Sequence, residues 1–143
     1  MKTLFESSHR EYRLIISDAT RRQVLLPVVV TEQGVLDQFV WYMSLHQLKS
    51  RSWQDSSTLA MQLLLEFMEA NRNYFEKPRA LFTAFSNALY TGTVEGGRDP
   101  SGLYWSARQL DDASKLIGHI TQFTDWLSVI NEDARLQLNP WRV

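Results

Sequence analysis

From Ser52 to Ala70 the chain reads SWQDSSTLAMQLLLEFMEA, the segment with the clearest periodicity in the sequence. Its apolar residues recur at intervals of four, four and three positions, which places their side chains on one face of an α-helix. These residues are Leu59, Leu63, Phe67 and Ala70. Further apolar residues widen the stripe, namely Leu64, Leu65 and Met68. The pattern predicts a long helix with one side buried against the rest of a domain.

Short polar residues precede this helix. Asp55, Ser56 and Ser57 carry the side-chain oxygens that accept hydrogen bonds from the first free N–H groups of a helix. We therefore expect the N-cap among them, and we expect the helix to fray near Asn71 to Asn73.

Three more amphipathic segments accompany the central one. A first helix is predicted from residue 36 to about Gln47, and a third from Pro78 to a stop at Gly92. The last is expected from about Asp111 to Asn131, where apolar residues recur at alternating intervals of four and three. Residues 91–107 hold four glycines and one proline and are expected to form a long loop.

The beginning of the chain has a different pattern. Residues 12–17 and 24–31 are rich in β-branched residues, and a polar segment with Arg21 and Arg22 separates them. Two such runs predict a β-hairpin. The expected fold class is mainly α, a four-helix bundle preceded by a short N-terminal β-hairpin.

Composition narrows the classes of function. The chain has 143 residues, the size of one domain, with 44% hydrophobic and 22% charged residues, as in a globular protein. It has no cysteine, which excludes disulfides and thiolate metal sites. No segment reaches the length of a membrane span, and we expect a cytoplasmic protein without a membrane partner. The net charge of −1 argues against a purely electrostatic nucleic-acid binder.

Three segments resemble the N-terminal core-binding (SAM-like) domain of tyrosine recombinases, the phage-integrase family. They are the hydroxyl-rich lead-in and spaced Leu and Phe of residues 52–68, the helix of residues 113–127 with its closing Trp126-Leu127, and the pair Asn139-Pro140. The resemblance spans about residues 35–140. It suggests an extension at 1–33, a core-binding domain at 34–140, and at 141–143 the start of a junction to a second domain. The residue 12–31 hairpin and the 91–107 loop depart from the family's common pattern.

The resemblance implies a function. Members of this family clamp double-stranded DNA between two domains, and a C-terminal catalytic domain exchanges the strands through a covalent phosphotyrosyl link. This chain would be the non-catalytic half, without a cofactor, and its partners would be duplex DNA, the catalytic domain of the same protein and further copies assembled on the DNA. The histidines of this chain are isolated from one another, and no paired histidines or phosphate loop suggest a metal or nucleotide site.

Two groups of residues are candidates for DNA contact. Basic, aromatic and hydroxyl side chains surround the expected start of the central helix, where phosphates and base edges could be bound. They are Lys49, Arg51, Trp53, Gln54, Ser56 and Ser57. The second group is expected opposite the apolar stripe of the last helix or just before that helix. It comprises Arg108, Lys115, His119 and Gln122. The alternative for the first group is a solvated interhelical loop with an ordinary helix cap, and for the second a plain polar helix face.

Aromatic residues outside the stripes keep a second function open. We expect Tyr104 and Trp105, in the long loop, to pack back over the bundle, and Trp41, Trp126 and Trp141 to lie in the core or at a domain junction. The alternative to the recombinase domain is a helical protein-interaction module without DNA binding, and a self-contained enzyme is a third hypothesis. An exposed aromatic loop and the near-neutral charge would favour the interaction module.

Overall fold

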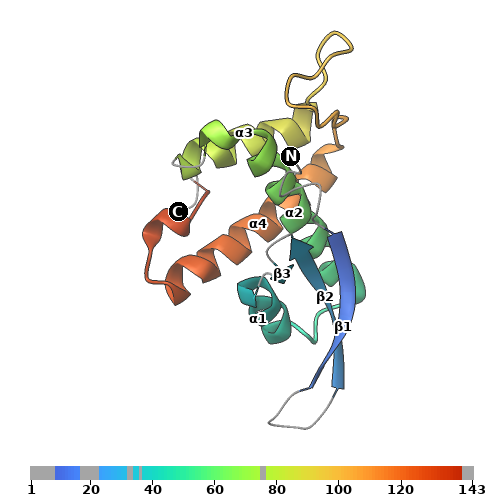
Figure 1. The fold of residues 1–143 in the computed structure, drawn as a ribbon, viewed down its shortest axis with the longest axis vertical. Helices are drawn as coiled ribbons and strands as arrows, with labels where there is room; N and C mark the ends of the chain where they lie inside the picture. The colour runs from blue at the N-terminus through green and yellow to red at the C-terminus, as the bar shows by residue number, and fades with distance from the viewer. Residues whose placement is uncertain (1–8, 17–22, 32–33, 36, 75–76, 140–143) are drawn as a thin grey trace.

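The computed structural model describes residues 9–16, 23–31, 34–35, 37–74 and 77–139. Within them the chain forms four α-helices (Figure 1): α1 Asp37–Leu45, α2 Arg51–Ala70, α3 Pro78–Thr91 and α4 Leu110–Ile130. Two short 3₁₀ helices follow α2 and α4, η2 Arg72–Tyr74 and η3 Ala134–Leu136. The prediction of a mainly helical fold with four helices is confirmed.

Three strands precede the helices. They are β1 His9–Ile16, β2 Gln23–Thr31 and β3 Gly34–Val35, in the sheet order β1-β2-β3. β1 and β2 are antiparallel, with His9 opposite Val30 and Ile16 opposite Gln23, and β2 lies against α1 and α2. The turn between β1 and β2, with Arg21 and Arg22, lies outside the described residues, so the predicted hairpin turn stays a prediction.

Helix α2 begins earlier than the sequence suggested. Its N-cap is Ser50, whose Oγ accepts a hydrogen bond from the backbone N–H of Trp53 at 3.1 Å. The expected cap at 55–57 is therefore wrong, and Ser56 and Ser57 lie in the second turn of the helix. Gln54 reinforces the earlier start, because its Nε2 donates to the carbonyl oxygens of Gln47 and Lys49, both at 3.3 Å.

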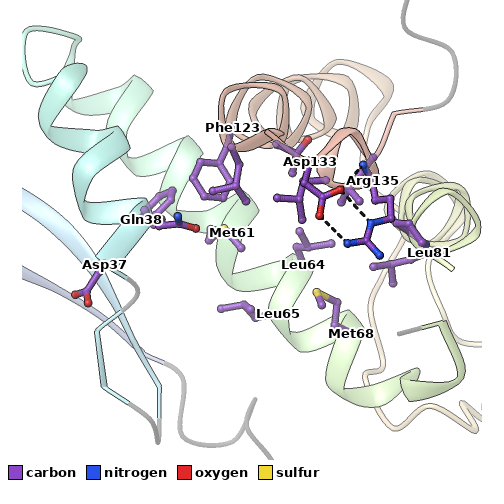
Figure 2. A pocket seen from close by; sticks show the side chains of 16 residues that line it. Asp37, Gln38, Met61, Leu64, Leu65, Met68, Leu81, Phe123, Asp133 and Arg135 are labelled. Atoms are coloured by element: carbon purple, nitrogen blue, oxygen red, sulfur yellow. Dashed lines mark hydrogen bonds and ion pairs between the residues drawn. The ribbon is translucent and has the colours of Figure 1, made fainter. Parts of the chain in front are cut away.

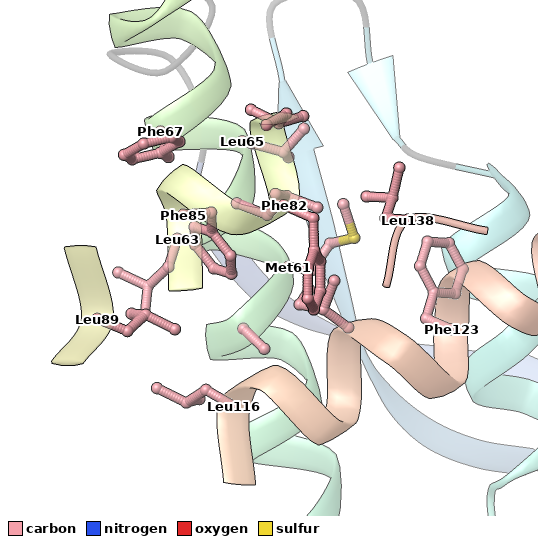
Figure 3. Close-up of a cluster of buried hydrophobic side chains, with 14 of the residues drawn as sticks. Met61, Leu63, Leu65, Phe67, Phe82, Phe85, Leu89, Leu116, Phe123 and Leu138 are labelled. Carbon is pink, nitrogen blue, oxygen red and sulfur yellow. The ribbon is translucent and has the colours of Figure 1, made fainter. Parts of the chain in front are cut away.

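The core lies between α2 and the other three helices (Figure 3). Burying apolar side chains contributes most of the free energy that holds such a bundle together. Figure 3 labels Met61, Leu63, Leu65, Phe67, Phe82, Phe85, Leu89, Leu116, Phe123 and Leu138, all of them buried. The predicted stripe of α2 is confirmed for Leu63 and Phe67, and its neighbours Leu64 and Leu65 are buried as well. No helix of the described residues is both long and apolar enough to cross a membrane.

Helix α3 has the predicted ends. Pro78 occupies its first turn, and Gly92 caps its end with φ +77° and ψ 179°, a conformation open almost only to glycine. A Cβ at Gly92 would come within 2.7 Å of the Trp105 carbonyl oxygen and 2.8 Å of the Ala107 nitrogen. Gly92 therefore lets the two ends of the following loop approach each other.

The loop between α3 and α4 is ordered by a buried carboxylate. Asp99 accepts hydrogen bonds from the backbone N–H of Ser101 and of Tyr104, both at 2.8 Å, and from the Ser101 hydroxyl at 2.6 Å. Burial opposes ionisation of this carboxyl, but the hydrogen bonds prevail and lower the pKa of Asp99 to about 2. The predicted long loop is confirmed, and it is internally bonded.

The two aromatic residues of this loop behave differently. Trp105 packs on Phe67 and Phe85, with ring centroids at 5.9 and 6.2 Å, as expected. Tyr104 is 59% exposed and has φ +53°, so the expectation that it packs over the bundle is wrong. Its backbone is held by Asp99 and its ring faces solvent.

Candidate nucleic-acid interface

Four rings join the start of α2 to the middle of α4. The ring of Trp53 stacks on His46, with centroids 5.1 Å apart, and meets His119 edge-on at 5.2 Å. Tyr42, which is fully buried, lies 4.5 Å from His46 and 6.2 Å from Trp53. We refer to Tyr42, His46, Trp53 and His119 as the Trp53 cluster. Through this cluster, residues that are 66 positions apart in sequence become neighbours.

Cationic side chains surround the Trp53 cluster. The Nζ of Lys49 lies 5.8 Å from the centre of the Trp53 ring, a distance that suits a cation–π contact. Arg51, in the first turn of α2, is exposed and lies 4.0 Å from Asp55. Lys115 precedes His119 by one turn of α4, is exposed, and is close enough to lower the pKa of His119. The structure thus brings Lys49 and Lys115, from the two predicted groups, to the same cluster.

Helix α4 continues this surface. Asp111, Lys115, Gly118 and Gln122 are all exposed and follow one another at helical spacing. Gln122 therefore presents its amide beyond Lys115 on the same face. This part of the predicted α4 surface agrees with the structure.

His119 is not on that exposed surface. Its side chain is 6% exposed, and its Nδ1 is buried without a hydrogen-bond partner among the described residues. The expectation that it projects opposite the apolar stripe is wrong, because Trp53 covers this position of α4. Burial, and then the charge of Lys115, lower the pKa of His119, which favours the neutral ring.

Two of the predicted DNA-contact residues near the start of α2 are also buried in the bundle. Gln54 is 6% exposed and holds the turn before α2, and Ser57 is 2% exposed within the bundle. Both side chains are therefore buried, and the expectation that they are exposed for contact at the helix start is wrong. Gln54 faces the turn before α2, to which it is hydrogen-bonded, and Ser57, three residues later, lies on the same side of the helix. Trp53 itself is half-buried, and Ser56 is half-buried in the second turn.

Arg108 belongs to a different part of the molecule. It lies at the end of the 92–109 loop, where its backbone N–H donates to the Leu89 carbonyl oxygen at 3.0 Å. Its charge acts on Glu66, thirteen residues beyond Trp53 along α2. At 1.5 Å per helical residue, this separation is about 20 Å, so Arg108 is not brought to the Trp53 cluster.

Sequence reasoning missed three members of this site. Ser50 caps α2, and Tyr42 and His46 support Trp53 from the other side. Tyr42 and His46 stand four positions apart, and Nδ1 of His46 lies 2.8 Å from the Tyr42 carbonyl oxygen. That spacing was the available signal, since residues four apart meet on a helix.

A separate hollow lies across the bundle (Figure 2). It has a volume of about 830 Å³, and apolar side chains from α2, α3 and α4 form most of its wall. At its edge Asp133 and Arg135 are joined by a short ion pair at 2.9 Å, drawn in Figure 2. The lining residues labelled in Figure 2 are Asp37, Gln38, Met61, Leu64, Leu65, Met68, Leu81, Phe123, Asp133 and Arg135. Such a wall suits an apolar group and offers no cluster for acid–base chemistry.

Within the described part of the chain, no three His, Asp or Glu side chains are grouped so that they could hold a metal ion. Comparison with protein-family models, with curated proteins and with solved structures found no match for this chain. A function must therefore be inferred from the residues and their arrangement.

Proposed function

We propose that this chain is the DNA-binding, core-binding domain of a site-specific tyrosine recombinase. In this proposal the start of α2 and the exposed face of α4 hold duplex DNA, and a domain outside this chain performs the strand exchange. The observation that carries the proposal is the contact of Trp53 with His119, which unites two polar helix surfaces. The resemblance of residues 35–140 to the family's domain points to the same function.

The chemistry of the surface suits a nucleic-acid backbone. Lys49, Arg51 and Lys115 supply three positive charges near the N-terminus of α2, where the helix dipole also favours phosphate. The amide of Gln122 can pair with a base edge, as glutamine does with adenine. Phosphate contacts fix position and the amide contributes sequence preference. In a chain of net charge −1, DNA binding through this surface requires these three cations to outweigh the nearby Asp55 and Asp111.

The test is fluorescence anisotropy with a labelled duplex at about 50 and 200 mM salt. A protein that neutralises about three phosphates should lose roughly 40-fold in affinity over that range. The double variant Lys49→Ala/Lys115→Ala should weaken binding. The slope of log affinity against log salt should then correspond to about two fewer neutralised phosphates. Arg51→Ala should act in the same direction.

The matched control is Lys77→Ala/Arg98→Ala, which removes two cations outside the Trp53 cluster. Lys77 precedes α3 and Arg98 lies in the 92–109 loop, and both are exposed. Binding that falls equally in both double variants would contradict the proposed surface. If no duplex binds at 50 mM salt, the alternative of a helical protein-interaction module becomes the better account.

A further inference from the structure

An exposed apolar stripe runs over α1 and the C-terminal part of α4, which lie side by side in Figure 1. The rings of Trp41 and Trp126 are in edge-to-face contact at 5.2 Å. The stripe continues through Leu45, four residues after Trp41, and through Val129 and Ile130, three and four residues after Trp126. Exposed fractions are 48% for Trp41, 58% for Leu45, 75% for Val129 and 39% for Ile130.

Two contacts hold together the helices that carry the stripe, the Trp41–Trp126 ring pair and one hydrogen bond. Gln38 Nε2 donates to Asn131 Oδ1 at 3.1 Å, so the start of α1 and the end of α4 are tied together. Single exposed apolar residues are ordinary on a protein surface, but contiguous ones mark a site of interaction. Four of the eight exposed large hydrophobic residues in the described part of the chain belong to this stripe.

The charges beside the stripe are acidic. Within residues 37–45 and 122–132, the exposed charged residues are Asp37 and Glu132. Asp125 lies on the other side of α4, with its carboxylate oxygens buried, and the next cation along the chain, Arg135, is paired with Asp133. Asp37 and Glu132 are both exposed and lie next to the Gln38–Asn131 bond, at the same end of the stripe. The nearest cation after α1, Lys49, is directed to the ring of Trp53.

We propose that this stripe binds an amphipathic helix of a partner protein that carries basic residues beside its apolar face. An amphipathic helix binds an exposed apolar surface through side chains spaced three and four apart. Lysine or arginine at one end of that helix would face Asp37 and Glu132 and fix its direction. A second copy of this chain fits less well. If its stripe packed against this one, its α1 would offer no lysine or arginine to pair with Asp37 and Glu132.

The test uses two labelled peptides of about 14 residues, one of Leu and Lys in a helical amphipathic pattern and one of Leu and Glu in the same pattern. Fluorescence anisotropy with the full chain should show the Leu–Lys peptide binding at least about tenfold more tightly. Val129→Lys should weaken that binding by about tenfold or more. Glu132→Lys should weaken the Leu–Lys peptide and strengthen the Leu–Glu peptide.

The matched control is Val94→Lys, which places the same charge on an exposed valine of the 92–109 loop (43% exposed) and should leave the affinity unchanged. Equal affinity for the two peptides, or equal loss in Val94→Lys and Val129→Lys, would overturn the proposal. Sedimentation velocity tests the other occupant, a second copy of the chain, and should show a monomer. A dimer of the wild-type chain that Val129→Lys dissociates would assign the stripe to that second copy instead.

Discussion

The ring of Trp53, at the start of α2, meets the ring of His119, in the middle of α4, edge-on at a centroid distance of 5.2 Å. Edge-to-face ring pairs contribute free energy beyond the area they bury, about 0.5–1.5 kcal/mol for a well-placed pair. Because the same pair positions Lys49 and Lys115 around one surface, it links the stability of the bundle to the proposed DNA contact.

Replacing Trp53 by alanine should therefore affect both properties. We expect Trp53→Ala to lower the free energy of unfolding by about 2–3 kcal/mol, since a half-buried indole and its ring contacts are lost. Urea denaturation measures this change. Leu48→Ala is the control, because Leu48 is 86% exposed and its loss should cost less than about 0.5 kcal/mol. A Trp53→Ala protein as stable as the control would show that the cluster does not hold α2 to α4.

The buried His119 should make stability depend on pH. Burial, and then the nearby Lys115, lower the pKa of His119 in the folded chain below its ordinary value of 6.5. Its contribution is therefore present above about pH 6.5 and is lost as the pH falls towards the folded pKa, because the unfolded chain binds the proton more readily.

The variant His119→Phe keeps an aromatic ring against Trp53 and removes the titrating group. Its stability relative to wild type should rise between pH 7 and pH 5, measured by urea denaturation at each pH. A constant difference between the two proteins across this range would exclude a titrating role for His119.

Glu66 should make the stability of the folded chain depend on pH in the opposite direction. Burial raises the pKa of its carboxyl to about 7, against hydrogen bonding from Trp105 and the charge of Arg108, which both lower it. The folded pKa lies above the ordinary value of 4.5, so its contribution is complete below about pH 4.5 and is lost as the pH rises through 7.

We expect Glu66→Gln to be more stable than wild type at pH 8, by about 1 kcal/mol after allowance for solvent screening, and to lose this advantage at pH 5. Thermal unfolding at the two pH values checks the prediction. Glu95→Gln, an exposed carboxyl of the 92–109 loop, is the control. His119 and Glu66 change the free energy of unfolding in opposite directions over overlapping pH ranges. The pH dependence of the wild-type protein alone would therefore show only the difference between the two effects.

Gly92 offers a test of the loop geometry. Gly92→Ala should lower the free energy of unfolding by about 2–4 kcal/mol, because its Cβ would collide with backbone atoms of Trp105 and Ala107 at a positive φ. Gly96 also has a positive φ, +59°, but no atom lies within 4 Å of its Cβ position. Gly96→Ala should therefore cost only about 1 kcal/mol. Equal losses in the two variants, measured by urea denaturation, would show that crowding at Gly92 is unimportant.

The helices could be predicted because their signals are local. The four-residue spacing of Leu59, Leu63 and Phe67 marks α2, and Pro78 and Gly92 mark the ends of α3 through their own backbone preferences. The start of α2 was misplaced because several residues could cap it. Ser50 is chosen over Ser56 and Ser57 by the anchoring of Gln54 to the preceding turn, a contact that no single-residue propensity contains.

The candidate site was predicted only in part, for a related reason. Lys49, Arg51, Lys115 and Gln122 could be placed at a helix start or on a polar face from spacing alone, and they are exposed in the structure or lie beside Trp53. His119 occupies a position that the helical period of α4 leaves at the border of its polar face. Whether such a border residue is buried depends on what the rest of the chain lays over it, here Trp53.

Local patterns in the chain were enough to establish that it is mainly helical, where α3 and α4 lie, and which faces of α2 and α4 are apolar, because hydrophobic periodicity and caps act within a few residues. Three-dimensional packing was needed to establish that Trp53 covers His119, that Gln54 and Ser57 are inside, and that Trp41 meets Trp126 in an exposed stripe. These facts depend on how helices distant in sequence pack, and packing is set by the fit of all the side chains at once.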